Sequence, residues 1–295
     1  MSLLNRTSDG MHSVLVVIHN LIAQEGALPF QHIVELCAPE GCGDPAQIRQ
    51  TLKTWIEFGL FSKSEDQKVL FSKNLSKHEK TRENLPRVAR KLLLTPENNL
   101  NLWATEGSGS ADFTRSISWL LAQDVYQTEL SSWPDAQSLL QKQTGKNITV
   151  MQNDTRWFGL KAWSQFLGFA VIGKFPSAVL TIDPTDAVRD SLPDVFHKRT
   201  KMEAEDFIAE LAKNIPVLDS GSYRKNVESK LSEHGGWTPP EKNNLSTSLS
   251  RAVLRLIHEG IIAGENLSDA GSKIHLIGRS NKVIETFSHL RLTEN

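Results

Sequence analysis

A short stretch near the N-terminus carries polar and basic side chains at the spacing of one helix face. Its members are Gln47, Arg49, Gln50, Lys53 and Thr54. Arginine and glutamine side chains can hydrogen-bond to base edges in the major groove, and cations pair with backbone phosphates. The chemistry that this set favours is therefore recognition of duplex DNA.

Further cations follow this stretch and recur near the C-terminus. They are Lys63, Lys68, Lys73, Arg251, Arg255 and Lys273. From residue 49 to 91 there are eleven lysines and arginines against five acidic residues, although the whole chain has a net charge of −1. Residues 92–220 are acidic, with eleven against sixteen. A basic block in a near-neutral chain suggests an anionic partner, and a solvated surface is the alternative.

Two groups of residues could instead bind a metal ion. Asp183, Asp186, Asp190 and Asp194 could hold Mg²⁺, but Asp183-Pro184 and Asp186 look more like a helix cap and first turn, where acids are favoured. Cys37 and Cys42 lie near His32, yet a zinc site usually needs four ligands and no second pair is present. We expect Cys37 to be a small core residue and predict no metal site.

Known catalytic motifs are missing from the sequence. There is no His-Glu-x-x-His, no Gly-x-Ser-x-Gly, and no Gly-Lys-Ser/Thr after the glycines at 107–110. We therefore predict a protein that is not an enzyme and uses no cofactor.

Length and composition set the class of protein. The chain has 295 residues, which predicts two or three domains, and only two cysteines, which fits a reducing compartment. Its longest apolar patch, around 166–172, is much shorter than the ~18 residues of a membrane span. Residues 1–10 lack a basic region followed by an apolar stretch. We expect a cytoplasmic protein with no membrane association.

The basic residues near the N-terminus need helices and a hairpin to position them. Apolar spacing predicts a helix over 11–24 and a shorter one after Pro29, with Ile33, Val34 and Cys37 inward. Asp44-Pro45 starts a third helix that ends at Gly59 and buries Ile48, Leu52, Trp55 and Ile56. Residues 60–61 and 69–71, separated by a polar turn at 64–67, predict a hairpin. Three helices and a hairpin indicate a winged helix.

The C-terminal part repeats this pattern. Residues 255–262 resemble residues 54–61: an amphipathic helix, a glycine and the start of a strand. We expect a helix over 223–231, no clear helix at 238–245, and a helix over 246–259 with Arg251, Arg255 and His258 outward. Residues 261–263 and 273–277 would pair as a hairpin around a turn at 266–271. This predicts a second winged helix.

The middle of the chain is helical by pattern, with helices expected over 112–123, 135–143, 155–172 and 202–214. Its aromatic residues Trp157, Phe158, Trp163, Phe166 and Phe169 could stack bases, but their helical spacing favours core packing. The acidic balance favours a protein-interaction role. The predicted fold class is therefore mainly α with small β-hairpin wings (α+β), in domains 1–78, 79–215 and 216–295.

Two stretches carry a resemblance to a known family. Leu3-Leu4-Asn5-Arg6-Thr7-Ser8-Asp9-Gly10, running into Ser13-Val14-Leu15, and Val217-Leu218-Asp219-Ser220-Gly221 resemble the DpdG family. This family belongs to bacterial gene clusters that place 7-deazaguanine derivatives in DNA and restrict unmodified DNA. The resemblance implies a phage-defence setting, protein partners from the same cluster and DNA as the target. It transfers no active-site residues.

Together these observations predict a non-enzymatic DNA-binding accessory subunit of a DNA modification and restriction system. Its partners would be double-stranded DNA, proteins of the same antiviral system and, as a possibility, a second copy of the chain. One alternative is a scaffold whose winged helices dock an ATPase, helicase or nuclease. Another is a winged-helix transcriptional regulator.

Overall fold

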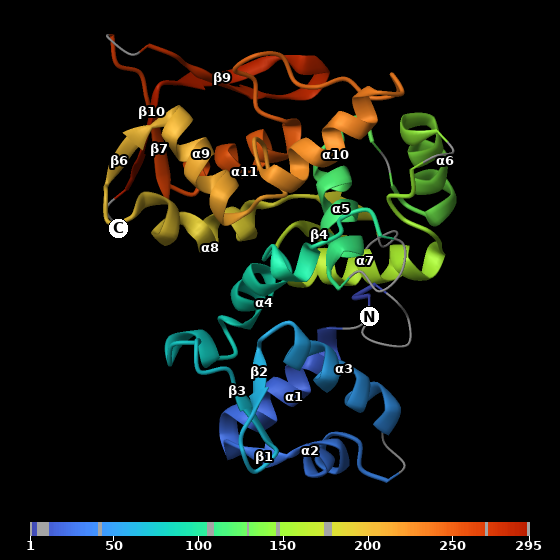
Figure 1. Cartoon of the computed structure of the whole chain (residues 1–295). Coiled ribbons are helices and arrows are strands. Elements are labelled where there is room, and N and C mark those ends of the chain that lie inside the picture. The colour runs from blue at the N-terminus through green and yellow to red at the C-terminus, as the bar shows by residue number, and fades with distance from the viewer. Residues whose placement is uncertain are drawn as a thin grey trace. The chain divides into compact units, whose positions relative to one another are not determined.

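The computed structural model describes residues 2–4, 12–40, 43–104, 109–128, 130–145, 148–173, 179–268 and 271–293. Over these residues the protein is a mixed α+β fold in which helices are joined by small antiparallel sheets, as predicted (Figure 1). Contacts divide it into two compact units: Met1–Thr114 with Met151–Leu167, and Arg115–Val150 with Gly168–Asn295. These boundaries differ from residues 78 and 215, and the division into three domains stays a prediction.

The first unit begins with the three helices and the hairpin that the sequence predicts (Figure 1). In chain order the elements are α1 (His12–Glu25), β1 (Leu28–Pro29), α2 (Phe30–Cys37), α3 (Pro45–Glu57), β2 (Phe61–Lys63) and β3 (Lys68–Phe71). The strands form an antiparallel sheet in the order β1-β3-β2, with Leu28 opposite Val69 and Phe61 opposite Phe71.

Helix α3 starts and ends where local sequence requires it. The Asp44 side chain accepts a hydrogen bond from the Ala46 backbone N–H at 2.8 Å, and Pro45 occupies the first turn, where its missing N–H costs nothing. Gly59 follows the helix with φ +88°, a conformation that side chains disfavour, and the chain then turns into β2. The predicted helix boundaries are confirmed here.

The core of this unit joins helices that are distant in sequence. Trp55 of α3 is fully buried, and its ring centroid lies 5.7 Å from that of Trp163 in α7 (Asp154–Phe166). Leu15, Ile18 and Ile22 of α1 are buried at helical spacing. Truncating a buried tryptophan costs about 3–5 kcal/mol, so Trp55 is a principal anchor that fixes how α3 is held.

The unit is completed by η1 (His78–Lys80), α4 (Leu85–Leu93) and η2 (Glu97–Asn99), together with the start of the chain. Leu3 and Leu4 are fully buried, and their backbone N–H groups donate to Gly109 O at 3.1 Å and to the Asp112 carboxylate at 3.2 Å. Ser2 also donates its hydroxyl to Asp112. The start of the N-terminal signature is thus a structural anchor; residues 5–10 lie outside the described residues.

The second unit contains more elements than the first among the described residues. The boundary between the units falls within α5 (Ala111–Leu121). The remaining elements are α6 (Trp133–Thr144), β4 (Ala170–Ile172), β5 (Leu180–Ile182), α8 (Thr185–Phe196), β6 (Lys201–Glu203), α9 (Ala204–Asn214), α10 (Ser222–Ser232), α11 (Thr247–His258), β7 (Ile262–Glu265), β8 (Ile274–Ile277), η3 (Arg279–Asn281), β9 (Val283–Phe287) and β10 (His289–Leu292). The sheets are β6-β10-β7, β4-β5 and β8-β9.

Two predicted helices in the middle of the chain are too long. The helix expected over 155–172 ends at Phe166, because Gly168 takes φ +78° and residues 170–172 pair with β5 as strand β4. The helix expected from residue 202 begins at Ala204, because Met202 pairs with Leu290 in the β6–β10 ladder. Tertiary strand pairing overrides the helical pattern in both places.

The predicted C-terminal hairpin is wrong. Strand β7 pairs with β10, with Ile262 opposite Leu292, whereas β8 pairs with β9, with Ile274 opposite Phe287. Residues 261–263 and 273–277 therefore belong to different sheets. The local pattern around residues 261–277 cannot reveal these pairings, because the actual partner strands, β9 and β10, come later in the chain.

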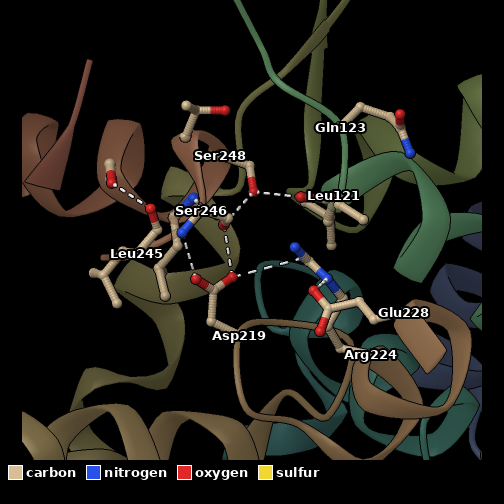
Figure 2. A network of polar contacts seen from close by, with 12 residues as sticks. Leu121, Gln123, Asp219, Arg224, Glu228, Leu245, Ser246 and Ser248 are labelled. Carbon is tan, nitrogen blue, oxygen red and sulfur yellow. Dashed lines mark hydrogen bonds and ion pairs between the residues drawn. The ribbon is translucent and has the colours of Figure 1, made fainter. Parts of the chain in front are cut away.

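A buried polar network anchors α11 in the second unit (Figure 2). Ser246 caps this helix, and its backbone N–H and hydroxyl both donate to the Asp219 carboxylate at 2.6 Å. Ser248 donates to the Leu121 carbonyl at 2.7 Å. The loop before α10, the start of α11 and the end of α5 are thereby joined through polar contacts.

The same network explains the second signature stretch. Arg224 is fully buried, donates to Glu228 at 2.5 Å and lies 3.6 Å from Asp219 (Figure 2). A Cβ at Gly221 would lie 2.2 Å from the Pro216 carbonyl oxygen, so only glycine fits there. The stretch 217–221 therefore forms a tight loop that places the Asp219 carboxylate next to Ser246, the residue that caps α11.

Candidate nucleic-acid interface

Helix α3 exposes two of its five predicted contact residues to solvent. Arg49 and Lys53 are exposed, whereas Gln47 and Gln50 are half-buried. Thr54 is only 1 % exposed, so its predicted position on the outer face is wrong. The reason is that the buried face of α3 is wider than its apolar residues indicate. It includes Thr51 and Thr54 as well as Leu52 and Trp55.

Arg49 is linked to α2 by a side chain that the sequence did not single out. Its Nη2 donates to Gln31 Oε1 at 3.4 Å, and Gln31 Nε2 donates to Glu35 Oε1 at 3.1 Å. Gln31 holds the guanidinium near α2 while the side chain stays exposed. Pro29, which starts α2, is the sequence signal that places Gln31 in the first turn of that helix.

The lysines of the hairpin lie close to the same edge of α2. The Lys63 ammonium is 5.8 Å from the centroid of the Phe30 ring, within cation–π range. Lys68 is exposed at the start of β3, opposite Pro29, and Lys73 is exposed just after this strand. We call Arg49, Lys53, Lys63, Lys68 and Lys73 the α3–hairpin surface.

The tip of the hairpin is acidic. Glu65 and Asp66 are exposed in the turn between Lys63 and Lys68, and this turn is closed by hydrogen bonds between Ser64 and Lys68. Two carboxylates between two lysines reduce the positive potential at the tip. Lys63 and Lys68 flank this turn, so the tip carboxylates offset part of the positive potential that these two lysines present to an anion.

The remaining cations of the basic block belong to the segment around η1 and α4. Lys77, Arg82 and Lys91 are exposed, and Lys91 lies 3.8 Å from Glu79. Hydrogen bonds from the backbone and hydroxyl of Ser76 hold the pKa of Glu79 below its usual range, so that Glu79 stays ionised and offsets the positive charge here. The α3–hairpin surface is the stronger candidate for anion binding.

The three predicted contact residues of the C-terminal module lie in the second unit, and two of them are engaged within it. Arg251 is half-buried, donates to the Ile182 carbonyl at 2.9 Å and covers the Tyr126 ring at 5.2 Å. Arg255 pairs with the buried Asp183. Lys273 is exposed immediately before β8.

Two members of the acidic cluster, Asp183 and Asp186, interact with residues in the first turns of α8. The Asp183 carboxylate accepts from the Thr185 backbone N–H at 3.1 Å, and Asp186 pairs with Arg189 one turn further along. Within the described part of the chain, no group of three or more His, Cys, Asp or Glu side chains converges as a metal site. Asp186 lies in the first turn of α8, as predicted, whereas the cap residue is Pro184 and Asp183 precedes it.

The cysteine and aromatic predictions are met in part. Cys37 is a half-buried free thiol whose pKa is raised by burial, and Cys42 lies outside the described residues. Trp157, Trp163 and Phe169 are fully buried, as expected of core residues. Phe158 instead is 61 % exposed, with the Lys161 ammonium 5.0 Å from its ring centroid.

Among the helices that the structure describes, none combines the length and the apolar character needed to cross a membrane.

Fold and site define a mixed α+β protein whose first unit carries a basic helix–hairpin surface. The chain belongs to the DpdG-like family, whose model matches residues 1–270. This match contains both stretches that carried the resemblance and confirms it. No curated protein and no solved structure matches the chain.

Proposed function

We propose that this protein is a non-enzymatic DNA-binding accessory subunit of the modification and restriction system to which its family points, and that it contacts duplex DNA through the α3–hairpin surface. The observation that carries the proposal is the exposure of Arg49 and Lys53 on α3 in a unit whose hairpin adds Lys63 and Lys68.

The arrangement of elements supports this assignment. The element order α1-β1-α2-α3-β2-β3 and the sheet order β1-β3-β2 are those expected of a winged helix, in which α3 would be the recognition helix and β2–β3 the wing. In such modules the recognition helix enters the major groove and flanking elements contact the backbone. Arg49 would then approach base edges, while Lys63 and Lys68 would meet phosphates.

Electrostatics supports the same surface. A protein that neutralises phosphates releases counterions, so each contact steepens the fall of affinity with salt. Contacts from the five cations of the α3–hairpin surface predict a clear dependence on salt. The half-buried Gln47 and Gln50 would contribute to sequence preference only if a duplex reaches the partly covered face of α3.

A titration of duplex DNA over a salt series tests the proposal. We expect Arg49→Ala/Lys53→Ala to weaken binding at least about tenfold and to make the salt slope shallower by about 2, since each phosphate contact contributes about 0.9. The matched control is Lys225→Ala/Lys242→Ala, which removes two exposed lysines of the second unit. Equal affinities for the two double variants would contradict the proposal.

A second candidate function is protein docking, and two features favour it. The hairpin tip is acidic, and the apolar side chains of Val17 and Leu36 in the first unit are about half exposed (49 % and 48 %). Under this hypothesis the chain would hold an ATPase, helicase or nuclease of the same system. Stable co-purification with such a protein, by a chain that does not bind DNA, would select docking.

A further inference from the structure

The second unit contains a pocket of about 440 Å³ that no part of the proposed function uses. It lies between the loop after α5, helix α6, the loop 236–241 and the start of α11. We propose that this pocket binds a small uncharged planar molecule with a carbonyl acceptor and N–H donors along one edge, the hydrogen-bonding pattern of a nucleobase. This goes beyond the proposed function and does not rest on it.

Two buried glutamines contribute to the pocket lining, and their amides have a defined orientation. Gln123 and Gln143 are each 3 % exposed. The Trp119 indole can only donate, and it donates to Gln143 Oε1 at 2.7 Å. Gln143 Nε2 must therefore donate to Gln123 Oε1, at 2.8 Å, which leaves Gln123 Nε2 to donate to the Trp119 carbonyl, also at 2.8 Å.

This closed chain leaves specific hydrogen-bonding capacity. Each amide nitrogen carries a second N–H, and each amide oxygen has a second lone pair. Because Trp119 sets the orientation of both amides, a ligand carbonyl would meet their remaining N–H groups without an amide flip. A ligand that loses hydration on entering such a site must make these bonds, because an unpaired buried polar group costs about 1–3 kcal/mol.

The loop that forms one wall is fixed against the rest of the unit. A Cβ at Gly236 would lie 2.4 Å from the Lys142 carbonyl oxygen, so the backbone approaches α6 as closely as only glycine allows. Trp237, the next residue, donates its indole N–H to the Ala122 carbonyl at 2.9 Å. Pro239 and Pro240 also line the pocket and restrict the loop further. The wall is therefore rigid, and its rings offer flat apolar surface.

The charge of the lining selects against anions. Asp124 and Glu241 line the pocket, and among the described residues of its lining there is no lysine or arginine. Asp124 Oδ1 accepts from the Tyr126 N–H at 2.9 Å, and its second oxygen can accept from a ligand N–H. Amide donors and a carboxylate acceptor in one pocket complement a molecule with both a carbonyl and N–H groups. A phosphate would be repelled.

Calorimetric titration of the full chain with guanosine, adenosine, cytidine and uridine, each beside its 5′-monophosphate, tests the proposal. We expect saturable binding of at least one nucleoside and weaker binding of its monophosphate. Absence of binding by all four nucleosides at millimolar concentration overturns the proposal. Tighter binding of the monophosphates, or displacement of the nucleoside by a lysine-rich peptide, also overturns it.

Asp124→Asn locates the site, because asparagine keeps the acceptor for Tyr126 but replaces the second carboxylate oxygen by a donor. We expect at least about a fivefold loss of nucleoside affinity. The control is Asp154→Asn, another aspartate that accepts from a neighbouring backbone N–H, here that of Thr155 at 2.7 Å. Equal affinities of the two variants contradict the site.

The double variant Asp124→Asn/Glu241→Gln tests the charge argument separately. We expect the preference for nucleoside over monophosphate to shrink, because both carboxylates of the lining have been neutralised. An unchanged preference would show that the discrimination arises elsewhere and would remove the pocket as its source. Failure of DNA binding by the first unit would leave these results unaffected, so the two proposals are distinguishable.

Discussion

Helices α3 and α11 start from similar sequence patterns and reach different environments. Each is amphipathic, carries two arginines or lysines four residues apart, and ends at a glycine before a strand. In α3, Arg49 and Lys53 stay exposed, and the Arg49 guanidinium donates to the side-chain amide of Gln31. In α11, Arg251 binds a backbone carbonyl and an aromatic ring, and Arg255 binds a carboxylate.

The difference teaches that basic helix faces cannot be assigned to DNA from spacing alone. A cation whose hydrogen bonds already connect parts of its own unit contributes to stability, and using it for a phosphate would require breaking those bonds. Arg49 of α3 would instead exchange a long bond to the exposed Gln31 amide, which is a smaller loss. The next predictions test whether α3 is a binding helix and α11 a structural one.

The two helix caps should differ most. Ser246→Ala should destabilise the protein by about 2–3 kcal/mol, because it removes the α11 cap and the buried hydroxyl that donates to the partly buried Asp219. Asp44→Ala removes only the exposed α3 cap and should cost about 1 kcal/mol. Urea unfolding measures both, and equal losses would contradict the contrast between a buried and an exposed cap.

Removing the arginines of α11 should affect stability rather than DNA binding. Arg251→Ala/Arg255→Ala should cost about 1–2 kcal/mol, with the Arg255–Asp183 pair discounted because Arg255 is 49 % exposed. Affinity for duplex DNA should stay within about twofold, since no phosphate contact is lost. Arg49→Ala/Lys53→Ala is the comparison, with a stability change within about 0.5 kcal/mol. A large loss of DNA affinity in the α11 variant would break the comparison.

The core beneath the α3–hairpin surface should be sensitive to acid. His19 of α1 is fully buried, its ring centroid lies 4.9 Å from that of Phe71, and burial lowers its pKa below the ordinary value of 6.5. The unfolded chain therefore binds a proton more readily than the folded one, and stability is lost as pH falls below about 6.5. Above that pH the contribution is constant.

Thermal unfolding between about pH 7.5 and 5 measures this loss in the wild type and in His19→Leu. We expect a flatter pH profile in the variant, because leucine cannot be protonated. Identical slopes of unfolding temperature against pH would show that other groups dominate the acid response.

The smallest effect is expected at the hairpin tip. Glu65→Gln/Asp66→Asn should raise DNA affinity by about two- to fivefold at low salt, because two carboxylates near Lys63 and Lys68 are neutralised. The gain should fade as salt rises. Asp206→Asn/Glu241→Gln, which neutralises two exposed acids of the second unit, is the control. A tip variant that binds DNA no better than this control would place the tip away from the phosphates.

Local signals predicted much of the first unit. Helix α3 begins and ends where its local sequence predicts, after Asp44 and at Pro45 on one side and before Gly59 on the other. The short apolar segments on either side of a polar turn predicted the β2–β3 hairpin. Caps, prolines and glycines act within a few residues, so they can be read without knowledge of the fold. These local signals could not predict that Thr54 is buried, because its burial depends on how much of the α3 surface the neighbouring elements cover.

In the second unit the same local signals gave wrong secondary structure or wrong strand partners where a strand distant in sequence pairs with the segment. Residues 170–172 and 201–203 became strands because β5 and β10 pair with them, and β7 paired with β10 rather than β8. The pocket was also invisible in the sequence, since its lining comes from segments more than one hundred residues apart.

By itself, then, the sequence determined the limits of α3, the first hairpin, the uneven charge and the family resemblance. Only the tertiary structure decided which cations remain free to meet a partner, which strands pair and where a pocket opens. The physical reason is range: capping and turn preferences act between neighbours in the chain, whereas burial, ion pairing and strand pairing depend on residues that folding brings together.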